Sequence, residues 1–556
     1  MLEFIRPEIR QYFFESDRET VPFSRQQRSL VYQRAKGQPD KRPFGTQLDV
    51  AAIGYEWINH SLQPSRLSTH DFRVTIGAGR AQPYDASVFN ISAMSFGALS
   101  ANAVLALNEG ARRGGFAHDT GEGSISRHHR ANGGDLIWEI GSGYFGCRHP
   151  DGSFSEERFI ENARLPQVKM VELKLSQGAK PGHGGVLPGP KVTAEIAEAR
   201  GVPVGTDCIS PSAHSAFATP IEMLRFIDRL RDLAGGKPTG FKLCIGHPWE
   251  WFAIAKAMLE TGIVPDFIVV DGAEGGTGAA PLEFTDHVGA PLQEGLLLVH
   301  NTLVGLNLRE RVRVGCAGKV VGAFDIARMM ALGADWCNSA RGFMFALGCI
   351  QAQACHTGSC PTGVTTQDPV RQKALVVPDK SERVYNFHQQ TLHALKELVQ
   401  AAGLNHPREI SASHIVRRNS EHGVKLLANL LPFVQPGELL ALRRLALQWM
   451  SRMASFRPYL SGAVWMGTAT RHSDIRIELF CDDPKSAELM LLEMRADFET
   501  RTTKGLAGAP VDVLSVHSFC PELQENVGVH FLVYDRDDIR GARRVDVLGA
   551  VRQLPQ

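Results

Sequence analysis

Short apolar runs recur along the middle of the chain, and amphipathic segments separate them. Segments such as SANAVLALNEGARR and PIEMLRFIDRLRDLA carry apolar residues at three- and four-residue spacing, which predicts helices. Eight strand and helix alternations over about 255 residues favour a closed parallel (β/α)₈ TIM barrel over a doubly wound sheet. The predicted strands are VFNISAM (88–94), GFAHDTG (115–121), VKMVELKL (168–175), VPVGTDCI (202–209), TGFKLCI (239–245), DFIVVDG (266–272), RVRVGCAG (311–318) and ADWCNSARG (334–342).

The chain on either side of these alternations predicts two further parts. Residues 1–85 are polar and charge-rich with helical patches, so we expect an N-terminal helical extension there. Residues 86–460 are expected to form the barrel and the helices that follow it. Residues 461–556 predict strand, helix, strand, strand and a last helix over 541–554, which is enough for a small appended α/β domain of unknown role.

Composition narrows the function classes. Sixty basic residues balance fifty-nine acidic ones, so the net charge of +1 gives no electrostatic argument for a nucleic acid or an anionic membrane as partner. The N-terminal stretch MLEFIRPEIRQYFFESDRET mixes charges into every turn, unlike a signal peptide, and no stretch reaches about 18 apolar residues. We therefore expect a cytoplasmic protein without a membrane span.

Three of the ten cysteines, Cys349, Cys355 and Cys360, fall within twelve positions. In a reducing compartment such a group is a metal or catalytic site more often than a disulfide. The gaps of five and four residues differ from the two-residue gaps of zinc knuckles. Spacing alone leaves three readings open: a metal site, a disulfide with a spare thiol, and ordinary core residues.

Loops at the carboxyl ends of the strands carry the active site in a (β/α)₈ barrel, and most Gly-rich stretches of this sequence fall there. The loops after the last two predicted strands contain Gly318, Lys319 and the turn Ala340–Arg341–Gly342. Backbone amides from glycines and the start of a helix, with one or two cations, suit a phosphate group. We predict a phosphate site there. The alternative is that Lys319 and Arg341 are only surface charges.

The loop DGAEGGTGAAP (271–281) contains Gly275, Gly276 and Thr277 and has little side-chain volume. Such a loop lets the backbone approach a flat ligand closely, so we predict one wall of a cofactor site. Lys242, near the end of the fifth predicted strand, is expected to project into the barrel mouth. The N1–C2=O edge of a reduced flavin would pair with a buried cation there, and a neighbouring Asp is the alternative partner.

A third Gly-rich loop, KLSQGAKPGHGGVLPGPKV (174–192), presents Lys174, Gln177 and Lys180 between glycines. Cationic and amide side chains in this arrangement suit a substrate with carboxylates or the carbonyl groups of a flavin. The same residues would also suit a phosphate.

Five stretches together resemble the FMN-binding synthase domain of glutamate synthase, and more closely the stand-alone proteins of that family: MSFGALS, TGEGS, KLSQGAKPGHGGVLPGPKV, GAEGGTGAAPLEFTDHVGAPLQEGL and GCIQAQACHTGSCPTGVTTQ. The resemblance covers roughly residues 86–440, with the motifs in family order. It implies a barrel with FMN in its mouth and a [3Fe–4S] cluster nearby. It also implies reduction of 2-iminoglutarate, formed from 2-oxoglutarate and ammonia, to L-glutamate by hydride from FMN N5.

The resemblance implies roles for single residues. It assigns Cys349, Cys355 and Cys360 to the cluster, and three thiolates can hold a cuboidal cluster that lacks one iron corner. It assigns Glu122, Gln177 and Lys180 to the substrate face of the flavin. Our hypothesis is that Lys180 or Gln177 polarises the substrate carboxylates and that Glu122 transfers a proton, with loop capping as the alternative for Glu122. The residues it assigns to FMN are Met94, Ser95, Lys242, Gly275, Gly276, Thr277, Gly318 and the Ala340–Gly342 turn.

Two stretches depart from the family pattern. TGEGSISRHHR is basic and His-rich where the family continues acidic, and SPSAHS keeps only His214 of a His pair. These differences leave open a related amine-transferring enzyme, such as an N-methylglutamate synthase-like subunit, and a flavin and iron–sulfur electron-transfer or redox-sensing subunit. No stretch resembles the family's amidotransferase domain, so a separate glutaminase subunit is a possible partner. No stretch carries a convincing dinucleotide fingerprint, so we expect an electron-donor protein such as ferredoxin or a reductase subunit.

Overall fold

The computed structural model describes residues 21–38, 40, 45–278, 280–433, 436–470, 473–505 and 510–538. The chain divides into two compact units. The first comprises Met1–Gly246, Ile263–Leu296 and Val312–Leu430, and the second His247–Gly262, Leu297–Arg311 and Leu431–Gln556. The domain boundaries expected at residues 85 and 460 stay predictions, and the helix expected over 541–554 lies outside the described residues.

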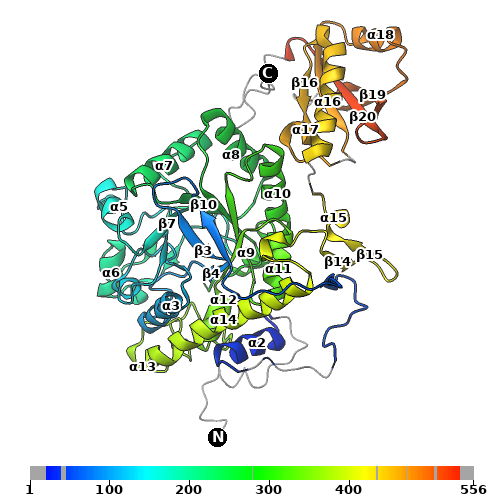
Figure 1. Ribbon diagram of the computed structural model, residues 1–556. Helices are drawn as coiled ribbons and strands as arrows, with labels where there is room; N and C mark the ends of the chain where they lie inside the picture. The colour runs from blue at the N-terminus through cyan, green and yellow to red at the C-terminus, as the bar shows by residue number, and fades with distance from the viewer. Residues whose placement is uncertain are drawn as a thin grey trace. The chain divides into compact units, whose positions relative to one another are not determined.

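Eight parallel strands of the first unit close into a barrel (Figure 1), so the predicted (β/α)₈ fold is confirmed. The barrel closes where β13 pairs with β4. The strands, in chain order, are β4 (Phe89–Ile91), β5 (His118–Asp119), β6 (Leu136–Ile140), β7 (Val168–Lys174), β10 (Thr239–Leu243), β11 (Phe267–Asp271), β12 (Arg313–Ala317) and β13 (Trp336–Ser339).

One predicted strand is wrong, and one barrel strand was not predicted. Residues 202–209 do not enter the barrel: only β9 (Cys208–Ile209) forms there, and it pairs antiparallel with β8 (Val186–Leu187). Pro203 and Gly205 explain the failure, because both residues weaken a strand interior. The barrel strand that the sequence did not predict is β6, LIWEI, in which all five residues are buried. The loop that begins at Leu175 therefore follows the fourth barrel strand and not the third.

Helices follow the barrel strands along the chain. The longer ones begin with recognisable caps: Thr219 accepts a hydrogen bond from the backbone N–H of Glu222, the Glu222 side chain accepts from Thr219, and Pro220 occupies the first helical position. The helices are α3 (Ala101–Gly114), α4 (Arg127–Arg130), α5 (Glu156–Ala163), α6 (Ala194–Arg200), α7 (Pro220–Leu233), α8 (Pro248–Thr261), α9 (Leu282–His287), α10 (Leu292–Gly305), α11 (Ala323–Ala331) and α12 (Arg341–Leu347).

Other elements of the first unit surround the barrel. The long helix α14 (Val377–Ala401) packs against α3, α11, α12 and the N-terminal helix α2 (Arg25–Ala35) (Figure 1). A hairpin of β2 (Arg73–Ile76) and β3 (Tyr84–Ser87) shares a buried core with strands β6, β7 and β11. The remaining elements are α13 (Pro369–Gln372), α15 (Leu427–Leu430) and a sheet of β1 (Glu56–Ile58), β14 (Ile415–Arg418) and β15 (Val424–Leu426).

The second unit contains a five-stranded sheet in the order β16-β17-β20-β19-β18. Strand β18 was not predicted, because its residues follow a helical stretch without a break signal. Trp449 packs against Phe531 in the core, with ring centroids 5.6 Å apart. The elements are α16 (Pro436–Arg452), β16 (Tyr459–Ser461), α17 (Gly462–Met466), β17 (Ile475–Cys481), α18 (Lys485–Glu493), β18 (Phe498–Lys504), β19 (Pro510–Cys520) and β20 (Glu525–Asp535).

Across the part of the chain that the structure describes, no helix combines the length and the apolar character that a membrane crossing needs.

Candidate functional site

A polar pocket lies among the loops that follow β5, β6 and β7. It encloses about 330 Å³ of empty space, part of which is open to solvent. Two ammonium groups, one carboxylate and one amide in one pocket suit a small ligand that carries carboxylates. The lining residues are Glu122, Ser142, Lys174, Leu175, Ser176, Gln177, Lys180, Gly182, His183, Gly184, Gly185, Pro211 and Ser212. The structure thus brings together all three residues that the sequence assigned to substrate.

Glu122 and Lys174 form an ion pair in this pocket, with Nζ of Lys174 3.0 Å from Oε2 of Glu122. Burial by itself would raise the pKa of Glu122, but the charges of Lys174, Arg200 and Lys180 hold it below its ordinary value. Glu122 is therefore ionised at neutral pH. Because its carboxylate faces the pocket and pairs with Lys174, a role as a loop cap does not account for its position.

Lys180 reaches the same pocket from the loop after β7. Its Nζ donates to the backbone carbonyl of Gly184 at 3.0 Å, which leaves the other two N–H groups of an ammonium for further acceptors. Burial and the charge of Lys174 lower the pKa of Lys180, and Glu122 opposes the shift.

The end of β7 is held in place by His214. Nε2 of His214 lies 2.8 Å from the carbonyl oxygen of Lys174, and Nδ1 lies 3.0 Å from the hydroxyl of Tyr144. That hydroxyl accepts a hydrogen bond from the backbone N–H of Ala216 at 3.2 Å, so it donates to Nδ1 and His214 donates to Lys174. His214 is thus a buried support behind the pocket.

The His-rich stretch after Glu122 folds into helix α4. His129 caps this helix together with Ser126, and each accepts a backbone N–H of the other. Nε2 of His128 lies 3.0 Å from Glu195 on α6, and its ring packs against Phe96. The two histidines that depart from the family pattern, His128 and His129, therefore serve in helix capping and in packing between elements. They are not among the described residues that line the pocket.

Below the pocket, the barrel interior contains two glutamates, Glu139 and Glu172, that the sequence did not mark as site residues. Lys242 pairs with Glu139 and lies 3.4 Å from Oε1 of Glu172, and all three are buried. Nζ of Lys174 lies 3.9 Å from Oε1 of Glu139. Lys242 thus has carboxylate partners on β6 and β7, and its predicted contact with a flavin stays a prediction. The period of two in VKMVELKL would have placed Glu172 and Lys174 on one face.

The Gly-rich loop after β11 packs directly against the cysteine loop. A Cβ atom on Gly278 would lie 2.7 Å from Cβ of Cys355, so a larger residue does not fit there. Gly276 has φ of +115° and lies against the guanidinium of Arg341, where a Cβ would collide. The predicted wall of a cofactor site and the three cysteines are therefore neighbours.

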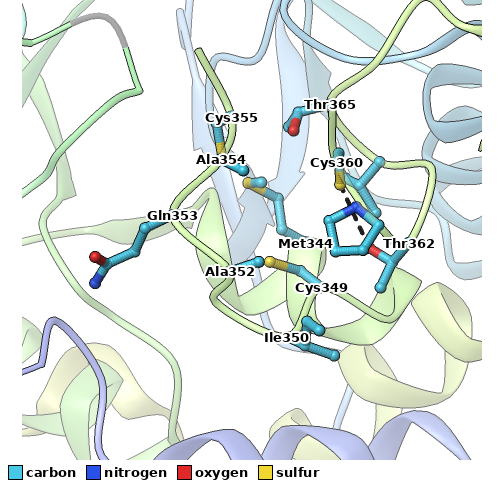
Figure 2. A pocket seen from close by; sticks show the side chains of 12 residues that line it. Met344, Cys349, Ile350, Ala352, Gln353, Ala354, Cys355, Cys360, Thr362 and Thr365 are labelled. Carbon is cyan, nitrogen blue, oxygen red and sulfur yellow. Dashed lines mark hydrogen bonds between the residues drawn. The ribbon is translucent and has the colours of Figure 1, made fainter. Parts of the chain in front are cut away.

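The three cysteines line one pocket together with Met344 (Figure 2). They are free thiols. Burial and Cys355 raise the pKa of Cys349 to about 12, whereas hydrogen bonds from Thr365 and Thr362 overcome burial and lower the pKa of Cys360. Lys191 donates to the carbonyl oxygen of Cys355 at 2.8 Å. Three thiols in one pocket with a cation beside them can ligate a metal centre once deprotonated.

The N-terminal extension supports this cysteine loop. The hydroxyl of Tyr32 on α2 donates to the carbonyl oxygen of Cys349 at 2.6 Å. The backbone N–H of Phe23 donates to Oε1 of Gln351 at 3.1 Å. Residues that carry no chemical motif of their own thus fix the position of the loop.

The predicted phosphate turns follow β12 and β13. Lys319 is exposed and has φ of +52°, and Arg341 is the first residue of α12. Arg341 is directed toward the cysteine side, with its guanidinium 5.6 Å from the ring centroid of Phe23. Met94 and Ser95 follow β4, where Arg200 donates to the Ser95 hydroxyl at 3.4 Å.

The chain matches one protein-family model, and two relatives and one solved structure are similar to it. The family model described as the conserved region in glutamate synthase matches residues 67–405. The glutamate synthase large subunit-like protein YerD of Bacillus subtilis (strain 168) is 38% identical over 472 residues, which cover 78% of this chain and 90% of that protein. An archaeal-type NADPH glutamate synthase of Thermotoga neapolitana is 35% identical over 315 residues, which cover 56% of this chain and 59% of that protein. A solved structure of a mandelate oxidase variant with a monooxide FMN adduct has a TM-score of 0.39 and 15% identity, over 75% of this chain and 96% of that one.

Proposed function

Because the chain belongs to the glutamate synthase family, we propose that it reduces 2-iminoglutarate, formed from 2-oxoglutarate and ammonia, to L-glutamate. Its relatives are named glutamate synthases, which are oxidoreductases, and the sequence prediction of an enzyme of this kind is confirmed. The particular substrate and cofactors go beyond the family and are proposed from the site.

The observation that carries the proposed reaction is the pocket with Lys174, Lys180, Gln177 and Glu122 on its walls. 2-Iminoglutarate carries two carboxylates, and charge-assisted hydrogen bonds from ammonium groups are strong and directional. In this proposal Lys180 and Gln177 orient those carboxylates, and Glu122 passes a proton to the imine nitrogen.

The residues beside the pocket fit both FMN and a [3Fe–4S] cluster. Cys349, Cys355 and Cys360 line one cavity, which matches the three ligands that such a cluster needs. The small residues around Gly276 leave the backbone open to a flat ring system, and the turns at Gly318 and at Ala340–Gly342 offer amides to a phosphate. When bound, FMN supplies a hydride and the cluster supplies single electrons.

The packing of Gly278 against Cys355 supports transfer between the two groups, because the loop proposed for the flavin and the loop proposed for the cluster are in contact. An electron-donor protein, such as a ferredoxin or a reductase subunit, would reduce the cluster in this proposal. The ammonia would come from a separate glutaminase subunit or from solution.

The alternative of amine transfer rested on the stretch TGEGSISRHHR. Glu122 of this stretch lines the pocket, whereas the His side chains and Arg127 that depart from the family pattern cap α4 or pair with Glu195, so these departures give the pocket no contact that favours methylamine over ammonia. Reductive amination with ammonia is therefore the function that we propose for this site.

Two measurements on the anaerobically purified protein test the proposal. Flavin and iron analysis should give one FMN and three iron atoms per chain, which are the contents of one flavin and one such cluster. Turnover with a reduced artificial electron donor should produce glutamate from 2-oxoglutarate plus ammonium, and no N-methylglutamate from glutamate plus methylamine. A protein without iron or flavin, or one that acts only on methylamine, would contradict the proposal.

A further inference from the structure

Charged side chains fill the barrel interior below the pocket, where this fold usually holds bulky apolar residues. Glu139 and Glu172 on neighbouring strands are paired in register, and both are almost completely buried. Buried charges destabilise a protein unless they are paired or neutralised, so each of these groups needs a partner or a change of protonation state. The charged residues there are Asp119, Glu139, Glu172, Lys174, Lys242 and Asp271.

These side chains form a continuous series from the interior to the pocket. Oε1 of Glu172 lies 3.4 Å from Nζ of Lys242, and Lys242 pairs with Glu139. Oε1 of Glu139 lies 3.9 Å from Nζ of Lys174, which lies 3.0 Å from Oε2 of Glu122 in the pocket. Carboxylates and ammonium groups alternate along the series, so a proton can pass between neighbours after small side-chain movements.

The interior has more carboxylates than cations. Four carboxylates face two ammonium groups, and Asp119 and Asp271 each accept a backbone N–H, from Gly121 and Gly178, both at 3.0 Å. Neither oxygen of Glu172 accepts a hydrogen bond. Glu172 is therefore the carboxylate whose ionised form has the least stabilisation. Burial, then Asp119 and Asp271, raise its pKa well above the ordinary value, and Lys174 opposes the shift.

A metal ion is not needed to neutralise this group. Carboxylate oxygens of Asp119, Glu139 and Glu172 lie within 4.8 Å of one another, which would suit a cation. Lys242 already pairs with two of the three, so its ammonium group takes the place that a cation would occupy. The excess negative charge is better relieved by a proton.

We propose that Glu172 holds a proton at neutral pH and that this proton is a reserve for the reaction in the pocket, passed through Lys242, Glu139 and Lys174 to Glu122. The inference rests on the proposed function, because imine reduction takes up one proton together with each hydride. Glu122 is ionised, so a proton that it gives to substrate must first reach it, and Lys174 is its ion-pair partner at 3.0 Å. Glu172 does not touch the substrate in this proposal, and it acts only through the side chains between it and the pocket.

Each step of this relay moves one proton and no electrons. Lys174 gives its proton to Glu122, which passes it to the substrate nitrogen. Lys242 gives its proton to the Glu139 carboxylate, which passes it on to Lys174, and Lys242 then takes a proton from Glu172. The Glu172 carboxylate recovers a proton from solvent between turnovers, so the series returns to its starting state.

Two isosteric substitutions test the protonation state without turnover. Glu172→Gln imitates the neutral acid, so it should leave the unfolding midpoint near that of the native protein at pH 7. Glu139→Gln removes an ionised partner from both lysines and should lower the midpoint clearly. A large loss in Glu172→Gln, equal to that in Glu139→Gln, would mean that Glu172 is ionised and would overturn the proposal.

Infrared spectroscopy gives a second readout of the proton. At neutral pH the native protein should show the carbonyl stretch of a protonated carboxylic acid, and Glu172→Gln should lose it. Glu109→Gln is the control, because Arg112 holds the pKa of Glu109 below its ordinary value and that carboxyl gives no such band. Because burial also raises the pKa of Asp119 and Asp271, the readout is the loss of intensity: an acid band of unchanged intensity in Glu172→Gln, or no acid band in the native protein, would refute a proton on Glu172.

Turnover tests the use of the proton. Glu172→Gln should lower kcat about tenfold or more with a changed pH profile, and should leave the KM for 2-oxoglutarate within about twofold. If Glu172→Gln had the kcat of the wild-type protein at every pH, the proposal that Glu172 supplies a proton to the reaction would be wrong. If the native protein makes no glutamate, the proposed function fails, and the infrared result still decides whether Glu172 is protonated.

Discussion

Nζ of Lys174 lies 3.0 Å from Oε2 of Glu122, and this ion pair joins the pocket to the charged interior of the barrel. Lys174 comes from the end of β7, where His214 fixes its carbonyl, and Glu122 comes from the loop after β5. The side chains of Lys174 and Glu122 are only 11% and 18% exposed, so solvent screens their interaction weakly. The charge of Lys174 therefore matters both for stability and for the substrate.

Replacing Lys174 by Met should destabilise the protein by about 3 kcal/mol, because it leaves Glu122 and Glu139 without their shared cation. Urea unfolding measures the loss. Arg112→Gln is the matched control, since it breaks an exposed ion pair with Glu109 within one helix and should leave the midpoint almost unchanged. Equal midpoints for the two variants would show that the Lys174 pair adds no stability.

The stability that Glu122 contributes should depend on pH in one direction. Burial opposes the shift, but Lys174 and its neighbours lower the pKa of Glu122 below 4.5 in the folded protein. The ionised form therefore stabilises the fold above the unfolded pKa, and this contribution is lost as the pH falls through the folded pKa. The difference in melting temperature between native protein and Glu122→Gln should be largest at pH 7 and should shrink on acidification.

The exposed Glu157 on α5 provides the control for that series, because Glu157→Gln should leave the melting temperature unchanged at each pH. A difference between native protein and Glu122→Gln that grows toward acid pH would contradict the assigned direction.

The sequence predicted features that repeat or that depend on local chemistry. Seven of the eight barrel strands follow from apolar runs between amphipathic helices, and the short gaps in the cysteine group pointed to one site. Contacts across the barrel were not predictable. The pair of Glu139 and Lys242 joins residues 103 positions apart, and Glu139 lies on the strand that was missed. No local pattern announces a partner on another strand.

Replacing Gly278 by Val should disturb the contact between the two proposed cofactor loops. The new side chain would begin 2.7 Å from Cβ of Cys355 and 3.1 Å from the backbone nitrogen of His356, so the cysteine loop must move. We expect a lower iron content after purification, with flavin content unchanged. Gly45→Ala is the control, because nothing lies within 4 Å of a Cβ at that position. Full iron content in Gly278→Val would show that the cysteine loop holds its iron without close contact with the Gly-rich loop after β11.

Replacing Cys355 by Ser should remove the iron–sulfur absorption and leave FMN bound, because the thiol lines the cysteine pocket and the residues proposed for FMN do not line it. Absorption spectra and iron analysis of the anaerobically purified variant measure this. Cys481→Ala, which changes a buried thiol of the C-terminal sheet, should keep both cofactors. Unchanged absorption in Cys355→Ser would remove the cysteine from the proposed ligands.

The central claim is that this chain makes glutamate by reducing the imine of 2-oxoglutarate. The most direct test is a single turnover, in which the anaerobically reduced protein is mixed with 2-oxoglutarate and isotopically labelled ammonium and the products are identified by mass spectrometry. We predict labelled L-glutamate in an amount that matches the electrons stored on the protein, and none from Lys180→Met. A reduced protein that contains both flavin and iron but forms no labelled glutamate would contradict the claim.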